Sequence, residues 1–185
     1  MCGIFGYVGP RNSTKICIEG LKYLEYRGYD SSGIAGLFSG HLLSCKEEGK
    51  ISVLEKAVTT SSLKLDLAIA HTRWATHGAA SKKNAHPQFD EKNTIAVVHN
   101  GIIENHHVLR EMLIAEGIFF VSDTDSEVVA QLISFFYEGD FYTAVKKTVS
   151  ELEGSFALAI IHKNHPDQII AVARENSLAI AQNLF

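Results

Sequence analysis

The spacing of apolar and polar positions changes from segment to segment along this chain, and the spacing predicts the element. Short apolar runs bounded by turn residues predict buried strands; they lie at 3–9, 33–38, 41–46, 67–71, 94–99, 156–161 and 169–173. Apolar residues three and four positions apart predict helices with one buried face; they lie at 13–26, 51–59, 105–116, 126–138 and 141–152.

The order of these elements favours an α+β sandwich over repeated strand–helix–strand units, because strands come in pairs and helices are grouped separately. Ser39-Gly40 predicts the turn of a hairpin between the second and third strands. A polar segment at 72–93, too long for a simple turn, separates two buried strands. Long loops between core strands often carry function, so this segment is a candidate for the site.

Composition narrows the class of protein. The 185 residues, 46% hydrophobic and 21% charged, predict one globular domain. A net charge of −4 argues against nucleic acid or an acidic membrane as a partner. The chain shows no signal peptide, no run of membrane-spanning length and no paired cysteine spacing, so we expect a cytoplasmic protein. It has no glycine-rich phosphate-binding motif, so we expect no nucleotide cofactor.

Cys2 directly follows the initiator methionine. Removal of Met1 would leave a thiol and a free α-amine on one residue. Their ordinary pKa values, about 8.5 and about 8, are close enough for the amine to accept the thiol proton. Activation of a nucleophile by a terminal amine is an established catalytic device. Position alone, however, favours a chance cysteine at an unremarkable start.

Polar, glycine-flanked segments lie at the predicted strand ends, and each also has a purely structural interpretation. Asn100-Gly101 follows an apolar strand, where the pair is most often a type I′ turn. Position alone favours a surface arginine for Arg73 and a helix N-cap for Asp125. Of the nine histidines, six lie between residues 71 and 107. They lack the spacing of helical metal ligands and no cysteine pair accompanies them, so we expect no metal.

Five segments carry a resemblance to a known family: CGI at the start, EYRGYDSSG at 25–33, HTRWATHG at 71–78, NAHP at 84–87 and HNGIIENH at 99–106. In this order and spacing they resemble the N-terminal-nucleophile glutamine amidotransferases. More narrowly, they are similar to the glutaminase domain of the glucosamine-6-phosphate synthase family. The resemblance implies a four-layer αββα sandwich of the N-terminal-nucleophile hydrolase type, with residues 1–185 as the glutaminase domain.

The resemblance also implies the reaction, which is hydrolysis of L-glutamine to glutamate and ammonia. Cys2 would attack the side-chain amide and form a γ-glutamyl thioester, while its own α-amine handles the proton. The Asn100 amide and the Gly101 N–H would stabilise the oxyanion. These roles fit the residue types, because glycine permits close backbone approach and an amide can donate to a developing negative charge.

Further roles follow from the resemblance alone. Arg73 would hold the glutamine carboxylate, as suits its planar fork, and Asp125 would face the ammonium. Supporting contacts are expected from residues around the site: Trp74 at its entrance, Thr76 and His77 on the substrate, Arg27 near the nucleophile and His86 as a loop anchor. Ammonia would reach fructose 6-phosphate through sugar-phosphate isomerase domains, which are absent from this chain.

The sequence departs from the family after Arg174, where relatives continue with a Gly-Ser-Pro turn and further strands. Here the chain reads ENSLAI at 175–180. We therefore expect a domain that is incomplete at its C-terminal end, with exposed sheet edges that favour low solubility or a homodimer. Three alternatives stay open: another class II amidotransferase, a catalytically inactive fragment, and a metal-binding module.

Overall fold

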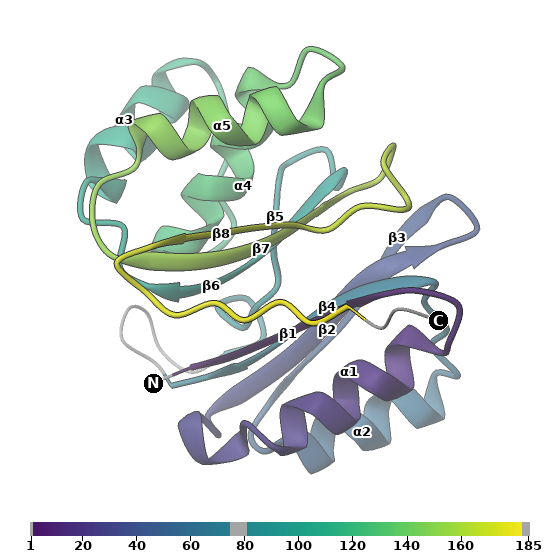
Figure 1. Ribbon diagram of the computed structural model, residues 1–185. Helices are drawn as coiled ribbons and strands as arrows, with labels where there is room; N and C mark the ends of the chain where they lie inside the picture. Colours follow the sequence, from purple (N-terminus) through teal and green to yellow (C-terminus); the bar gives the residue numbers. More distant parts are fainter. Residues whose placement is uncertain (1, 75–80, 183–185) are drawn as a thin grey trace.

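The computed structural model describes residues 2–74 and 81–182. These residues form two four-stranded sheets, in the orders β1-β4-β2-β3 and β5-β6-β7-β8. The sheets face each other between two layers of helices (Figure 1). Helices α1 and α2 cover the outer face of the first sheet, and α3, α4 and α5 cover that of the second. The layers therefore follow the predicted order of helix, sheet, sheet, helix.

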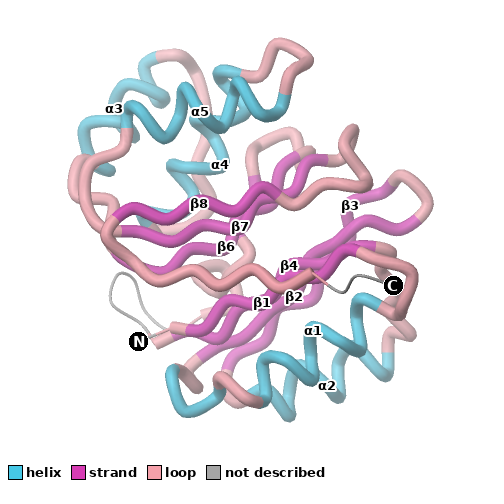
Figure 2. The backbone as a smooth tube through the Cα atoms, viewed as in Figure 1, coloured by secondary structure: helices cyan, strands magenta, loops and turns pink. Residues whose placement is uncertain are grey.

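The strands agree closely with the apolar runs and pair antiparallel throughout the described sheets (Figure 2). The first sheet contains β1 (Gly3–Val8), β2 (Ser31–Phe38), β3 (His41–Glu48) and β4 (Leu67–Arg73). The second contains β5 (Gln88–Phe89), β6 (Ile95–Gly101), β7 (Phe156–His162) and β8 (Ile170–Arg174). Strand β5, two residues long, lies inside the segment predicted to be irregular, since so short a strand has no detectable periodicity.

The helices are α1 (Ser13–Lys22), α2 (Ile51–Thr60), α3 (His106–Ala115), α4 (Asp125–Phe136) and α5 (Phe141–Glu151). The prediction of one helix over 13–26 is wrong at its end. A separate 3-10 helix, η1 (Glu25–Arg27), follows α1. The chain turns there so that Gly28 can pack against the backbone of Arg73, where a Cβ would lie 2.6 Å from the Arg73 carbonyl carbon. None of the helices in the described ranges is long and apolar enough to cross a membrane.

A cluster of buried aliphatic residues joins the two sheets and sets where their ends meet. Its fully or nearly buried members are Ala35, Leu37, Leu67, Ile69, Ala96, Val98, Ala159 and Ile161. Strand β1 runs antiparallel to β4 with Gly3 opposite Thr72, so the start of β1 lies beside the end of β4. The end of β6 comes to the same place from the second sheet, because the Asn100 side chain contacts Cys2. This common end of the sandwich holds the candidate site.

Candidate active site

Cys2 lies at the leading end of β1, against the end of β4. Its Sγ accepts a hydrogen bond from the Trp74 N–H at 3.2 Å and lies 3.6 Å from the Trp74 carbonyl oxygen. Burial raises the pKa of the Cys2 thiol, although the Trp74 N–H and the Arg73 charge act in the opposite direction. The thiol is therefore protonated at neutral pH, and its use as a nucleophile requires a base.

Arg27, at the end of η1, holds the main chain of Cys2. Its Nε donates a hydrogen bond to the Cys2 carbonyl oxygen at 2.9 Å. Thr72 reinforces the turn after η1 through a short hydrogen bond from its hydroxyl to the Gly28 carbonyl. The guanidinium of Arg27 thus lies beside Cys2, as expected, and it bonds the Cys2 backbone.

Asn100 and Gly101 end strand β6, where they pair with Ala157 and Phe156. The alternative of a type I′ hairpin turn is therefore wrong. The Asn100 Nδ2 donates a hydrogen bond to the Cys2 carbonyl oxygen at 3.1 Å, so this amide faces Cys2. Gly101 has a φ of 117°, and a Cβ there would lie 2.1 Å from the Ser155 carbonyl oxygen. Only glycine fits this backbone without displacing β7.

Arg73 and Asp125 place opposite charges at the same cavity. The Arg73 side chain is buried, with 4% of its surface exposed, so the surface-arginine alternative is wrong. Asp125 is also buried, and its Oδ2 accepts the Ile103 N–H at 3.0 Å. The N-cap alternative for Asp125 is wrong too, because Thr124 caps α4 and accepts the Glu127 N–H. Since Thr124 is the N-cap, the Asp125 carboxylate remains at the cavity.

A cavity of about 310 Å³ brings these groups together. Of the predicted site residues, its walls contain Cys2, Arg27, Arg73, Trp74, His86, Asn100, Gly101 and Asp125. Thr76 and His77 lie outside the described residues. Trp74 is half-exposed and packs edge-on against Tyr29 with 5.4 Å between ring centroids, which suits a residue at the entrance. One buried cation and one buried anion beside a thiol match the charges of an amino acid.

The sequence interpretation gave no role to five further wall residues: His99, Ile102, Thr124, Ser126 and Asn176. Ser126 holds two of the histidines, since its Oγ lies 2.7 Å from His86 Nε2 and 2.8 Å from His99 Nδ1. His86, which lies in the loop before β5, is therefore also anchored to α4. The strand pattern could have indicated His99, which shares β6 with Asn100. The place of Ser126 next to Asp125 could have indicated it, whereas nothing local indicates Asn176.

The buried histidines predict a loss of stability in acid. Burial lowers the pKa of His71 from 6.5 to about 3 and holds that of His86 well below 6.5. The unfolded chain therefore takes up these protons first as the pH falls. The free energy of unfolding is unaffected by these groups above about pH 6.5. Below that pH, each buried histidine lowers the free energy of unfolding by up to about 1.4 kcal/mol per pH unit.

Urea unfolding at intervals between pH 7 and pH 4 measures this dependence. The variant His86→Gln should lose stability less steeply than the wild type on acidification. His41→Gln serves as the control, because it removes an exposed histidine instead of a buried one. Equal slopes for His86→Gln and the wild type would show that His86 titrates alike in both states.

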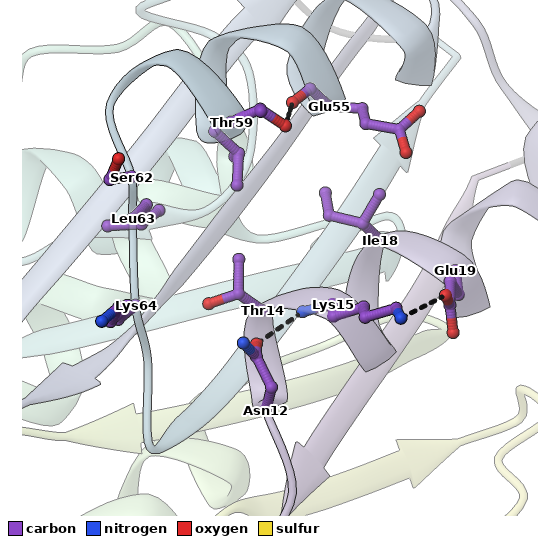
Figure 3. Close-up of a pocket in the computed structure, with 11 residues that line it drawn as sticks. Asn12, Thr14, Lys15, Ile18, Glu19, Glu55, Thr59, Ser62, Leu63 and Lys64 are labelled. Carbon is purple, nitrogen blue, oxygen red and sulfur yellow. Dashed lines mark hydrogen bonds and ion pairs between the residues drawn. The ribbon is translucent and has the colours of Figure 1, made fainter.

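A second cavity of similar size lies between α1 and α2, on the outside of the first sheet (Figure 3). Three of its charged residues form ion pairs: Lys15 lies 3.9 Å from Glu19 (Figure 3), and Glu55 pairs with Lys22 at 2.7 Å. Among the described residues, its walls contain neither a thiol nor an arginine. The chemistry therefore favours the cavity at Cys2.

Comparison with known proteins agrees with this fold. Residues 71–181 match the glutamine amidotransferase domain family, and the chain belongs to that family. Two solved structures share the four-layer N-terminal-nucleophile fold, each with 29% identity over 86% of this chain. They are the glutamine phosphoribosylpyrophosphate amidotransferase of B. subtilis complexed with ADP and GMP, with a TM-score of 0.76 and 35% of its chain covered, and an allosteric regulatory enzyme of purine biosynthesis, with a TM-score of 0.77.

Curated relatives are more similar in sequence. A glutamine–fructose-6-phosphate aminotransferase (isomerizing) of Caldanaerobacter subterraneus subsp. tengcongensis is 47% identical over 180 residues. The enzyme of the same name from Chlamydia caviae is 48% identical over 182 residues. Each alignment covers 97% of this chain and 30% of the relative. The chain thus spans under a third of the length of these relatives and is homologous to their glutaminase part.

Proposed function

We propose that this chain hydrolyses L-glutamine to glutamate and ammonia through a γ-glutamyl thioester on Cys2. The observation that carries the proposal is the placement of the Cys2 thiol and the Asn100 amide in one cavity with the buried charges of Arg73 and Asp125. Glutamine carries one carboxylate, one ammonium and one primary amide. These four residues offer a complementary partner for each.

Catalysis begins once removal of Met1 frees the α-amine of Cys2. The amine takes the thiol proton, and Sγ attacks the side-chain carbonyl carbon of glutamine. The tetrahedral oxyanion accepts hydrogen bonds from the Asn100 Nδ2 and the Gly101 N–H. When the C–N bond breaks, the α-ammonium returns the proton to the departing nitrogen, and ammonia leaves. Water, deprotonated by the same amine, then hydrolyses the thioester and releases glutamate.

Substrate binding relies on Arg73 for the carboxylate and on Asp125 for the ammonium. Trp74 stands at the entrance, and Thr76 and His77 supply further substrate contacts. Arg27 and His86 support the site by holding the Cys2 main chain and the 83–87 loop. No cofactor takes part in this scheme.

The ammonia acceptor is the second part of the proposal. The similarity at 47% to enzymes named glutamine–fructose-6-phosphate aminotransferase favours fructose 6-phosphate, converted to glucosamine 6-phosphate, over the acceptor of the 29% identical phosphoribosylpyrophosphate enzyme. The acceptor step belongs to the portion of those relatives that this chain does not cover. We place the enzyme in the cytoplasm, and self-association into a homodimer stays a prediction.

Labelling of the nucleophile tests the proposed hydrolysis. The protein is incubated with a glutamine-like alkylating agent, such as a diazoketone analogue, and its N-terminal peptide is analysed by mass spectrometry. We expect a peptide that begins at Cys2 and carries one equivalent of label, and we expect free glutamine to protect it. Label on Cys17 or Cys45 instead, or an unlabelled active protein, would contradict the proposal.

Replacement of Arg73 should weaken glutamine binding. In Arg73→Ala we expect the KM for glutamine to rise about 100-fold or more, because a buried charged partner of the carboxylate is lost. Steady-state ammonia release measures it. Arg110→Ala is the control: Arg110 is partly buried and bonds the Ser122 carbonyl away from the thiol. An unchanged KM in Arg73→Ala would remove Arg73 from the substrate site.

A further inference from the structure

A buried histidine links the two sheets directly behind the proposed oxyanion site. His71 lies on β4, opposite Ile4 of β1 and Gly33 of β2, and none of its surface is exposed. Its ring reaches the second sheet. There its Nε2 lies 2.9 Å from the His99 carbonyl oxygen and 3.0 Å from the Asn100 Oδ1.

The His99 carbonyl decides which nitrogen of His71 carries the proton. A backbone carbonyl oxygen can only accept hydrogen bonds, so the Nε2 beside it must be the donor. The ring is neutral, since burial lowers its pKa to about 3, and Nδ1 is then unprotonated. This tautomer also avoids a buried N–H at Nδ1, which has no hydrogen-bond partner among the described residues.

The tautomer of His71 in turn decides the orientation of the Asn100 amide. An N–H at Nε2 can face the amide oxygen but not the amide NH₂ group, because two donors repel each other. Asn100 must therefore turn Oδ1 toward His71. Its Nδ2 then points to the Cys2 carbonyl oxygen, at 3.1 Å. In the opposite orientation the amide would present an oxygen to the nucleophile residue.

We propose that His71 is a positioning residue that holds the Asn100 amide with its NH₂ group toward the reacting carbonyl. The His99 carbonyl oxygen fixes the proton of His71 on Nε2, and this N–H then fixes the orientation of the Asn100 amide. The inference rests on the proposed function, in which Asn100 stabilises the oxyanion. An amide that is free to flip spends part of its time as a repulsive acceptor, and preorganised donors are worth more than mobile ones.

A role in packing alone makes a different prediction. The His71 ring contacts the ring of His86, with centroids 4.2 Å apart, and a core residue would need only this volume. The strand pairing of His71 uses its backbone and does not need the ring. Two replacements of similar length therefore separate the roles. His71→Gln retains an N–H donor at its tip, whereas His71→Met fills the space without one.

Glutamine hydrolysis by the mature protein provides the test. We expect His71→Met to lower kcat about 10- to 100-fold with the KM for glutamine within about twofold, and His71→Gln to retain most of the wild-type kcat. Adding His71→Met to Asn100→Ala should cause no further loss, because His71 acts through Asn100. His162→Met, which removes a buried histidine from β7, should leave kcat unchanged.

Equal losses in His71→Met and His71→Gln, or an additive loss in the double variant, would overturn the inference. If His71→Met unfolds, the nitrogen NMR spectrum of the wild-type imidazole decides. A proton on Nε2 is expected, and a proton on Nδ1 would overturn the inference. A wild-type protein that neither releases ammonia nor accepts label on Cys2 would refute the proposed function instead, and the NMR measurement would still report on the contact between His71 and Asn100.

Discussion

Retention of Met1 should abolish glutamine hydrolysis, with a loss in kcat of about 10⁴-fold or more, comparable to that of Cys2→Ala. With Met1 attached, the nitrogen of Cys2 is a peptide amide and cannot accept a proton. Among the described residues, no side-chain base is hydrogen-bonded to the Cys2 Sγ, whose polar contacts are to the main chain of Trp74. Burial also raises the pKa of the thiol, so the thiol does not ionise readily without a base.

The retained form is made by inserting a bulky residue after Met1, and mass spectrometry verifies its terminus. Initial rates of ammonia release then compare it with the trimmed protein and with Cys2→Ala. Cys45→Ala is the matched control, since Cys45 is a half-buried thiol on β3 outside the cavity, and it should keep full activity. Rapid turnover by the Met1-retaining form would eliminate the α-amine as the base and require another proton acceptor.

Asn100→Ala should lower kcat about 100- to 1,000-fold while the KM for glutamine changes little. One donor to an oxyanion contributes roughly 3–4 kcal/mol to the barrier, because it acts on charge that develops only in the transition state. The Asn100 Nδ2 already points to the Cys2 carbonyl oxygen, so the donor is in place before substrate arrives. Binding of the substrate ammonium and carboxylate involves other side chains and should persist.

Asn105→Ala is the control for this prediction. Asn105 bridges the Glu151 carbonyl and the Glu153 N–H, so its loss should lower the melting temperature and spare kcat. Circular dichroism verifies that Asn100→Ala is folded before its rate is measured. A large increase in KM with an unchanged kcat would assign Asn100 to substrate binding and leave the oxyanion to other donors.

Local pattern predicted the elements well where their period was strong. The hairpin at Ser39-Gly40 was confirmed, with positive φ values of 49° and 78° at its two turn residues. The pattern failed at element ends, where the competing states differ by little free energy. Asp125 and Thr124 are both good N-caps, and the structure uses Thr124. Likewise, the helix predicted to reach residue 26 ends at Lys22, and a separate 3-10 helix leads to Gly28, which packs against β4.

The site shows the same division. Cys2 and the Asn100-Gly101 pair were identified from short segments whose residue types carry the chemistry. Ser126 was missed, because a serine inside a helix is ordinary until two histidines from other elements meet it. Local sequence favoured a surface position for Arg73 and an N-cap role for Asp125. Both interpretations were wrong, because burial depends on the residues that pack over a side chain.

By itself, then, the sequence determined the strands and helices, the family and the thiol proposed as the nucleophile, since these properties depend on neighbours along the chain. Only the tertiary structure decided that Cys2, Arg73, Asn100 and Asp125 share one cavity. It also decided that His71 reaches across to orient Asn100. These contacts join residues far apart in sequence, and they form only when burial of the apolar faces closes the two sheets on each other.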